Sequence, residues 1–172
     1  SRTDIPTSHV IEGTGAEHIQ ISGNTFTECN FGGRGDVITV ESLMNGERIG
    51  NTPLADIRIL NNEFNSCYQP PVNADNADGL IVTDNIFRDC EKLQIGERCK
   101  KATVSDNKFL SKGDCNADGS FNISDVVLLQ KWLLAIPGTD IADWKSCDLC
   151  RDGRLDVFDL CLMKRELVNG NY

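Results

Sequence analysis

The sequence predicts a two-part fold: an all-β solenoid over residues 1–112, then a small all-α module over residues 113–172 with two loop–helix repeats. Three observations support this division. A strand motif recurs four times before residue 112, an unrelated motif recurs twice after it, and the two motifs have different periods. Self-similarity at a fixed spacing is the sequence signature of stacked repeats, so we take the change of period as the boundary.

The first motif is a short alternating strand followed by Asn, one spacer residue and Phe. Its copies begin at His18, Asp56, Gly79 and Lys101. The shared side chains are Asn24, Asn62, Asn85 and Asn107, then Phe26, Phe64, Phe87 and Phe109. Because one short strand cannot bury its apolar side alone, we expect the copies to stack. An additional strand is expected over residues 37–40.

This pattern resembles the right-handed parallel β-helix family, which includes pectate-lyase-like and other polysaccharide-active enzymes. The resemblance implies that residues 1–112 are the C-terminal rungs of such a coil. It also implies that the asparagines form a ladder of amide hydrogen bonds and that the phenylalanines stack inside. Cys29, Cys67 and Cys90 recur with the motif and are expected to be small buried residues. A disulfide between stacked cysteines stays an alternative, since neighbouring rungs lie close enough.

The first part also carries acids and bases of the kind that catalyse polysaccharide cleavage, but none has a spacing specific for catalysis. They are Asp56, Arg58, Asp78, Asp84, Arg88 and Asp89. Two interpretations therefore stay open, and the catalytic residues are unknown. Residues 1–112 either end a longer coil or are themselves a polysaccharide lyase or glycoside hydrolase. Ser1 opens into polar sequence, and we expect the chain to be the tail of something longer.

The second motif is a twelve-residue loop that begins at Asp114 and has the spacing of a calcium loop. Calcium takes six to eight oxygen ligands, and positions 1, 3 and 5 of such a loop point inward together. Gly119 at position 6 allows the sharp turn. The predicted ligands of the first loop are Asp114, Asn116, Asp118, Ser120 and Asp125.

The loop recurs from Asp148, and we predict a second calcium ion there. The predicted ligands of the second loop are Asp148, Asp152, Arg154, Asp156 and Asp159. Position 3 is Cys150, a thiol that hard calcium does not favour. We hypothesise a disulfide between Cys150 and Cys161 that staples this loop in place of the lost ligand. The pairing of Cys99, Cys115 and Cys147 is left open.

Each loop leads into one apolar helix, expected over residues 124–134 and 159–168, with a short helical turn over 141–145. Two loop–helix repeats from Gly113 to about Asn169 resemble the dockerin family, in particular type I-like dockerins of rumen Ruminococcus cellulosomes. The resemblance implies that the module binds a cohesin on a scaffoldin. It would thereby anchor a polysaccharide-degrading β-helix protein in an extracellular, cell-surface cellulosome, where plant cell-wall polysaccharide is a further partner.

The family's partner-reading positions can be carried over to both copies. They are Ile123, Ser124, Gln130 and Lys131, then Val157, Phe158, Lys164 and Arg165. Because the two sets differ, we expect one dominant binding orientation. The alternative for Lys164 and Arg165 is a solvated charged face. A calcium sensor is disfavoured, because sensors change the angle within a helix pair and the entering helices are missing here.

Charge and composition narrow the classes of partner further. The net charge is −9, and residues 1–112 and 113–172 are both acidic, at −5 and −4. Nucleic acid and anionic membranes are therefore not expected as partners. Eight cysteines are more typical of an exported protein than of a cytosolic one.

Overall fold

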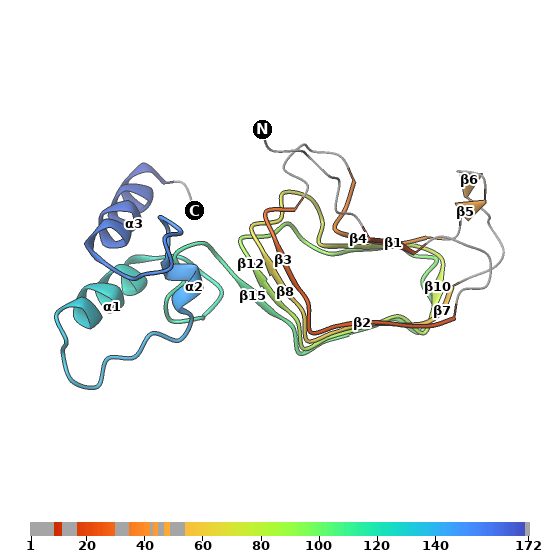
Figure 1. The fold of residues 1–172 in the computed structure, drawn as a ribbon, viewed down its shortest axis with the longest axis horizontal. Coiled ribbons are helices and arrows are strands. Elements are labelled where there is room, and N and C mark those ends of the chain that lie inside the picture. The colour runs from red at the N-terminus through yellow and green to blue at the C-terminus, as the bar shows by residue number, and fades with distance from the viewer. Residues whose placement is uncertain are drawn as a thin grey trace. The chain divides into compact units, whose positions relative to one another are not determined.

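The computed structural model describes residues 9–11, 17–29, 35–41, 43–44, 47–48 and 54–170. The chain divides into two compact units, Ser1–Lys108 and Phe109–Tyr172. Figure 1 shows parallel strands stacked in the first unit and helices in the second. Among the described residues, no helix combines the length and the apolar character needed to cross a bilayer.

In the described residues, three parallel sheets account for most of the strands of the first unit, and β15 (Lys108–Leu110) continues two residues beyond Lys108. The first has the order β1 (His9–Ile11), β4 (Ile38–Val40), β9 (Val72–Ala74) and β13 (Gln94–Ile95). In the second, the order is β10 (Ala77–Asp78), β7 (Leu54–Leu60), β11 (Ile81–Thr83) and β14 (Thr103–Ser105), and β2 (Glu17–Ser22) also pairs with β7. The third has the order β15 (Lys108–Leu110), β12 (Ile86–Arg88), β8 (Glu63–Asn65) and β3 (Thr25–Thr27).

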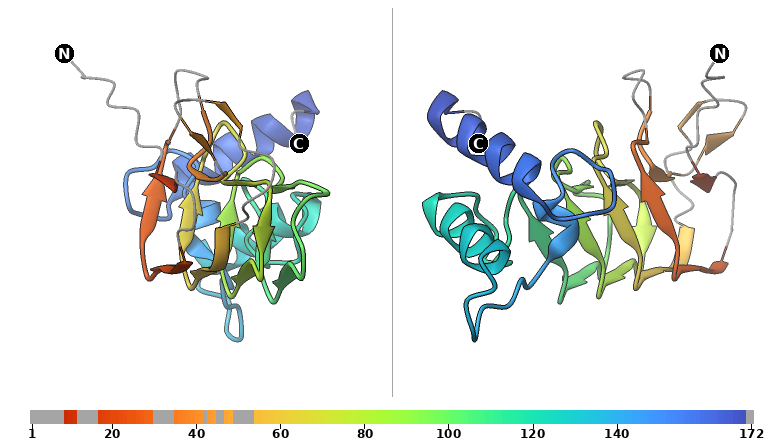
Figure 2. Two further views of the ribbon diagram at one scale, coloured as in Figure 1. Left: turned by 90° about the vertical axis from the view of Figure 1, so that its right-hand side faces the viewer. Right: turned by 60° about the vertical axis from the view of Figure 1, so that its left-hand side comes forward.

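The register follows the sequence repeat. Ile59 pairs with Val82, and Val82 with Val104, so equivalent residues of successive copies lie side by side. Figure 1 looks along the stack, and both views of Figure 2 show successive strands of the first unit side by side. In the second sheet the apolar positions face inward, and Ile57, Ile59, Leu80 and Val82 are fully buried. Apolar and polar residues alternate along each strand, so stacked strands bury a shared apolar face that a single strand could not bury.

The asparagine ladder is confirmed. The Asn62 and Asn85 side chains are buried, and the Nδ2 atom of Asn62 donates to Oδ1 of Asn85 over 3.0 Å. Asn24 donates in the same way to Asn62 over 3.2 Å, and Asn85 to Asn107 over 3.0 Å. Each buried amide therefore links one copy to the next. These bonds give hydrogen-bond partners to polar groups that would otherwise be buried without any.

The aromatic stack is confirmed for Phe26, Phe64 and Phe87. Their rings stack with centroids 4.8 Å apart at both steps. Phe109, in the fourth copy, is 47% exposed. It lies in β15, the end strand of its sheet, so no further strand follows to cover that side of the ring.

A left-handed backbone turn opens each copy of the motif. His18, Asp56 and Lys101 have φ of 59°, 48° and 52°, and Gly79 has 77° at the equivalent position. Glycine adopts this region freely, whereas β-branched residues are strained there. The first residue of the motif therefore has the same backbone conformation in every copy, which sequence reasoning had not recognised.

Up to Gly170, where the described part of the second unit ends, this unit contains three helices, α1 (Ile123–Leu133), α2 (Trp144–Cys147) and α3 (Val157–Asn169). α1 begins one residue, and α3 two residues, earlier than expected, and the short turn lies three residues later. α1 packs against α3. Their apolar faces meet in a core that includes Phe121, Val126, Leu129, Leu160 and Met163.

The predicted fold class is wrong. In the described residues most regular structure lies in β-sheets, and helices are few, with 11, 4 and 13 residues. The chain is therefore not a β-helix followed by an all-α module. The second unit devotes much of its length to loops with left-handed residues, such as Gly119 and Gly153, which cannot continue a helix. The antiparallel pair β5 (Leu43–Met44) and β6 (Glu47–Arg48) also departs from the expected coil.

Candidate calcium loops and partner surface

The first and last residues of the first loop are buried carboxylates held by backbone N–H groups. Asp114 accepts from Asp118 N over 3.1 Å and from Gly119 N over 2.8 Å. Asp125 accepts from Cys115 N over 3.0 Å and from Asn122 N over 2.9 Å. Both carboxylates are fully buried. The loop therefore holds the side chains of positions 1 and 12 in place, as a metal site requires.

The remaining predicted ligands of this loop are held by the same turn. Asn116 Oδ1 accepts from Asp118 N over 2.9 Å, and its Nδ2 donates to Asp118 Oδ2 over 2.8 Å. Asp118 Oδ1 accepts from Ser120 N over 2.9 Å. Gly119 has φ of 92°, the left-handed turn predicted for position 6. Positions 1, 3 and 5 thus offer carboxylate and amide oxygens, which fit calcium.

Electrostatics in the first loop favour a bound cation. Burial raises the pKa of the Asp114 carboxyl, and the nearby Asp125 and Asp118 carboxylates raise it further. The Gly119 and Asp118 N–H groups oppose this effect. A negative charge held out of water beside other negative charges is costly, and a divalent cation removes that cost.

The second loop repeats this arrangement. Asp148 accepts from Asp152 N over 3.2 Å and from Gly153 N over 2.8 Å. The buried Asp159 accepts from Cys150 N over 3.1 Å and from Asp156 N over 3.0 Å. Asp152 also accepts from the Arg154 backbone N–H over 2.9 Å. The oxygen donors fit calcium here as well, and position 3 is the one that departs.

Cys150 faces into the second loop. Its Sγ lies 3.6 Å from Asp148 Oδ1, and the donor atoms of Asp148, Cys150 and Asp152 all lie within 4.8 Å of one another. Loss of water around the sulfur, together with the nearby Asp159 and Asp152 carboxylates, raises the pKa of the Cys150 thiol to about 12, although the Asp152 backbone N–H opposes this effect. At position 3, the second loop therefore has the Cys150 thiol where the first loop has the Asn116 amide.

The residues at positions 9 and 12 of each loop also cap the helix that follows, a role that sequence reasoning missed. Asn122 and Asp156, at position 9, are the N-caps of α1 and α3. Asp125 and Asp159, at position 12, complete a capping box in each helix. The signal was present in the spacing, because an Asn or Asp three residues before an acid opens many helices. Each loop thus fixes the start of its helix.

All eight predicted partner residues lie on the helices and are exposed. Ile123 is 60% exposed, Val157 58% and Phe158 68%. Lys164 Nζ donates to Gln130 Oε1 over 3.3 Å, so the equivalent residues of the two copies meet between α3 and α1. The two sets are therefore in contact at this pair, and we call the eight residues together the helix-pair face.

The predicted Cys150–Cys161 disulfide is wrong. Both residues are free and exposed, and the sulfur of Cys150 points toward Asp148 inside its loop. Instead, a disulfide joins Cys115 and Cys147, which are both fully buried and lie 32 residues apart. It links the start of the first loop to α2, just before the second loop. Sequence spacing gave no signal for it, because the pair becomes close only through packing of the two repeats.

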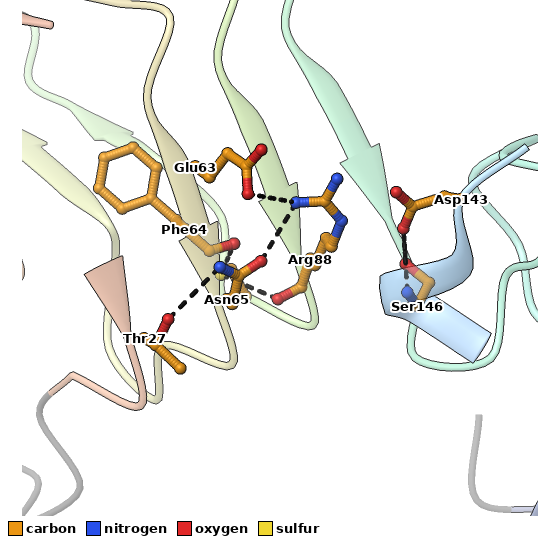
Figure 3. Close-up of polar contacts among 8 residues, drawn as sticks. Thr27, Glu63, Phe64, Asn65, Arg88, Asp143 and Ser146 are labelled. Atoms are coloured by element: carbon orange, nitrogen blue, oxygen red, sulfur yellow. Dashed lines mark hydrogen bonds and ion pairs between the residues drawn. The ribbon is translucent and has the colours of Figure 1, made fainter. Parts of the chain in front are cut away.

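The acids and bases of the first unit do not form one site in the structure. Asp56 accepts from Arg58 Nε and from His18 Nδ1, each over 2.7 Å, and lies in the second sheet. Arg88 lies in the third sheet, where it contacts Glu63 and Asn65 over 3.2 Å each (Figure 3). The others contact neighbours: Asp78 with Lys101, Asp84 with Thr83, and Asp89 with Ser66.

Comparison with known proteins gives one match. No curated protein and no solved structure matches the chain. The model of the dockerin type I domain family matches residues 112–168, the segment that contains both loops and nearly all of the three helices. This match supports a C-terminal dockerin, a type of module that binds cohesins and generally binds calcium.

Proposed function

We propose that residues 112–168 dock the chain onto a cohesin of a scaffoldin, with one calcium ion in each loop. The chain would thereby be held in a cellulosome at the cell surface, as part of a protein that acts on plant cell-wall polysaccharide. The family match supports the docking role. The buried Cys115–Cys147 disulfide supports an extracellular location, because such bonds persist mainly outside the cytosol.

The helix-pair face is the observation that carries the proposal. Calcium in the loops would hold the N-termini of α1 and α3, because the residues at positions 9 and 12 also cap these helices. The caps in turn fix Ile123, Val157 and Phe158 at the first positions of the helices, where they are exposed. Exposed apolar residues beside basic ones are typical of a protein-binding surface.

Phe158 is the expected anchor of the interface. It is 68% exposed, and aromatic anchors contribute about 2 kcal/mol or more to an interface, or about 30-fold in affinity. Phe158→Ala is expected to weaken cohesin binding by about that factor in titration calorimetry. Val168→Ala, at an 85% exposed position near the other end of α3, is the matched control and should bind like the wild type.

The difference between the two copies tests the binding orientation. Ser124 occupies in the first copy the position that Phe158 occupies in the second. If one orientation dominates, Phe158→Ala with Lys164→Ala abolishes binding, whereas Ile123→Ala with Gln130→Ala retains it. Equal, partial losses for the two double variants would mean that both orientations are used.

A further inference from the structure

The two loops differ in one metal-donor atom, which is a hard oxygen in the first loop and a soft sulfur in the second. Position 3 of the first loop offers the Asn116 amide oxygen, whereas position 3 of the second offers the Cys150 sulfur. Thiolates favour Zn²⁺ and similar soft cations, and carboxylate and amide oxygens favour calcium. The two copies therefore present different ligand chemistry on the same backbone frame.

The sulfur is placed where a metal would meet it. Within the described residues, Asp148, Cys150 and Asp152 form the one group of acids, cysteines and histidines whose donor atoms all lie within 4.8 Å of one another. Backbone N–H groups of residues 152 and 153 hold the Asp148 carboxylate beside the sulfur. Cys161 is also an exposed thiol, but it lies on α3, outside the loop.

We propose that the second loop exchanges its calcium ion for a thiophilic divalent cation, Zn²⁺ in the first instance. The ligands are Cys150 and the Asp148 and Asp152 carboxylates, and the first loop keeps calcium. Zinc takes sulfur and carboxylate oxygen in four-coordinate sites, and one position is left for water or a further loop oxygen. The metal–sulfur bond forms as the thiol proton passes to the buffer, without any change of oxidation state. The inference rests on the proposed function in one respect, that both loops are metal loops.

Cadmium-113 is the probe that distinguishes the two kinds of ligand, because a sulfur ligand moves its resonance far downfield of an all-oxygen site. With the full chain in excess calcium, one equivalent of Cd²⁺ should give a single downfield resonance. Cys150→Asp should move it to the all-oxygen region, and the matched control Cys161→Ser should leave it unchanged. A wild-type signal in the all-oxygen region alone, or a downfield signal that survives Cys150→Asp, would overturn the proposal.

Zinc affinity gives a second readout that does not depend on the resonance. Titration of the calcium-loaded chain with Zn²⁺ should show at least a tenfold loss of affinity in Cys150→Ser and no loss in Cys161→Ser. Circular dichroism of each variant checks that it is folded. Cohesin binding is measured separately in calcium without zinc, so failure of the zinc site and failure of the docking role are distinct results.

Discussion

Single residues hold the copies of the first unit together. Asn85 is fully buried, and its Nδ2 donates to the carbonyls of Ile59 and Thr83 and to Asn107, over 2.9–3.0 Å. Its Oδ1 accepts from the backbone N–H and the side chain of Asn62 over 2.9 and 3.0 Å. One side chain thus satisfies groups in three copies of the motif.

Asn85→Ala is therefore expected to destabilise the first unit by about 3–5 kcal/mol, because several buried polar groups lose their partners together. Urea unfolding of the chain, followed by circular dichroism, measures this loss. Asn24→Ala is the control: Asn24 is exposed and starts the ladder, so its removal should cost about 1 kcal/mol. Equal losses for the two variants would contradict a structural role for the buried amide.

Asp56 predicts an acid-dependent loss of stability. Its hydrogen bond to Arg58, followed by that to His18, lowers the pKa of the Asp56 carboxyl below the ordinary value of 3.8. The folded state then favours the ionised form, so the contribution is complete above pH 3.8 and is lost as the pH falls through the lowered pKa. Thermal unfolding across this range should show a steeper acid loss in the wild type than in Asp56→Asn. Parallel curves would rule this effect out.

At the scale of elements, the two loops and the helices that follow them could be predicted because their signals are local. The twelve-residue spacing, with Gly119 or Gly153 at position 6, identifies each loop within a single stretch of sequence. The ladder was equally readable from Asn62 and Asn85, which repeat at a fixed spacing. What could not be predicted was set by packing between distant segments, as the exposure of Phe109 at the end of its sheet and the Cys115–Cys147 pair show.

The Cys115–Cys147 disulfide is expected to stabilise the second unit by about 3–4 kcal/mol, since it closes a loop of 32 residues. Cys115→Ser with Cys147→Ser should lower the unfolding free energy by about that amount. A peptide map of the non-reduced protein should contain the Cys115–Cys147 pair. Cys161→Ser is the control and should leave stability unchanged; a map with Cys150 joined to Cys161 would contradict the structure.

Removal of calcium should act on the helices through the caps. Asp125 and Asp159 close the loops and also belong to the capping boxes of α1 and α3. Without the cation, repulsion between the buried carboxylates destabilises the folded loop. The capping residues at the start of each helix are then no longer held in place. Excess chelator should therefore lower the melting temperature of the second unit and its helical signal. No change in either would show that the loops fold without a metal.

At the scale of the whole molecule, the chain combines a stacked sheet unit with a small unit that presents two capped helices. The net charge is −9, whereas the helix-pair face includes three basic residues, Lys131, Lys164 and Arg165. These basic residues on an acidic protein favour a partner whose binding surface is acidic and contacts the helix-pair face alone. The second unit would then attach the sheet unit to the partner protein.

Titration calorimetry of the full chain against a panel of cohesins is the experiment that decides whether docking depends on calcium. The measurement is made with calcium and again with excess chelator. We expect tight binding to at least one cohesin in calcium and its loss on chelation. If every cohesin fails while calcium still binds and stabilises the fold, the loops are structural and the docking function is wrong.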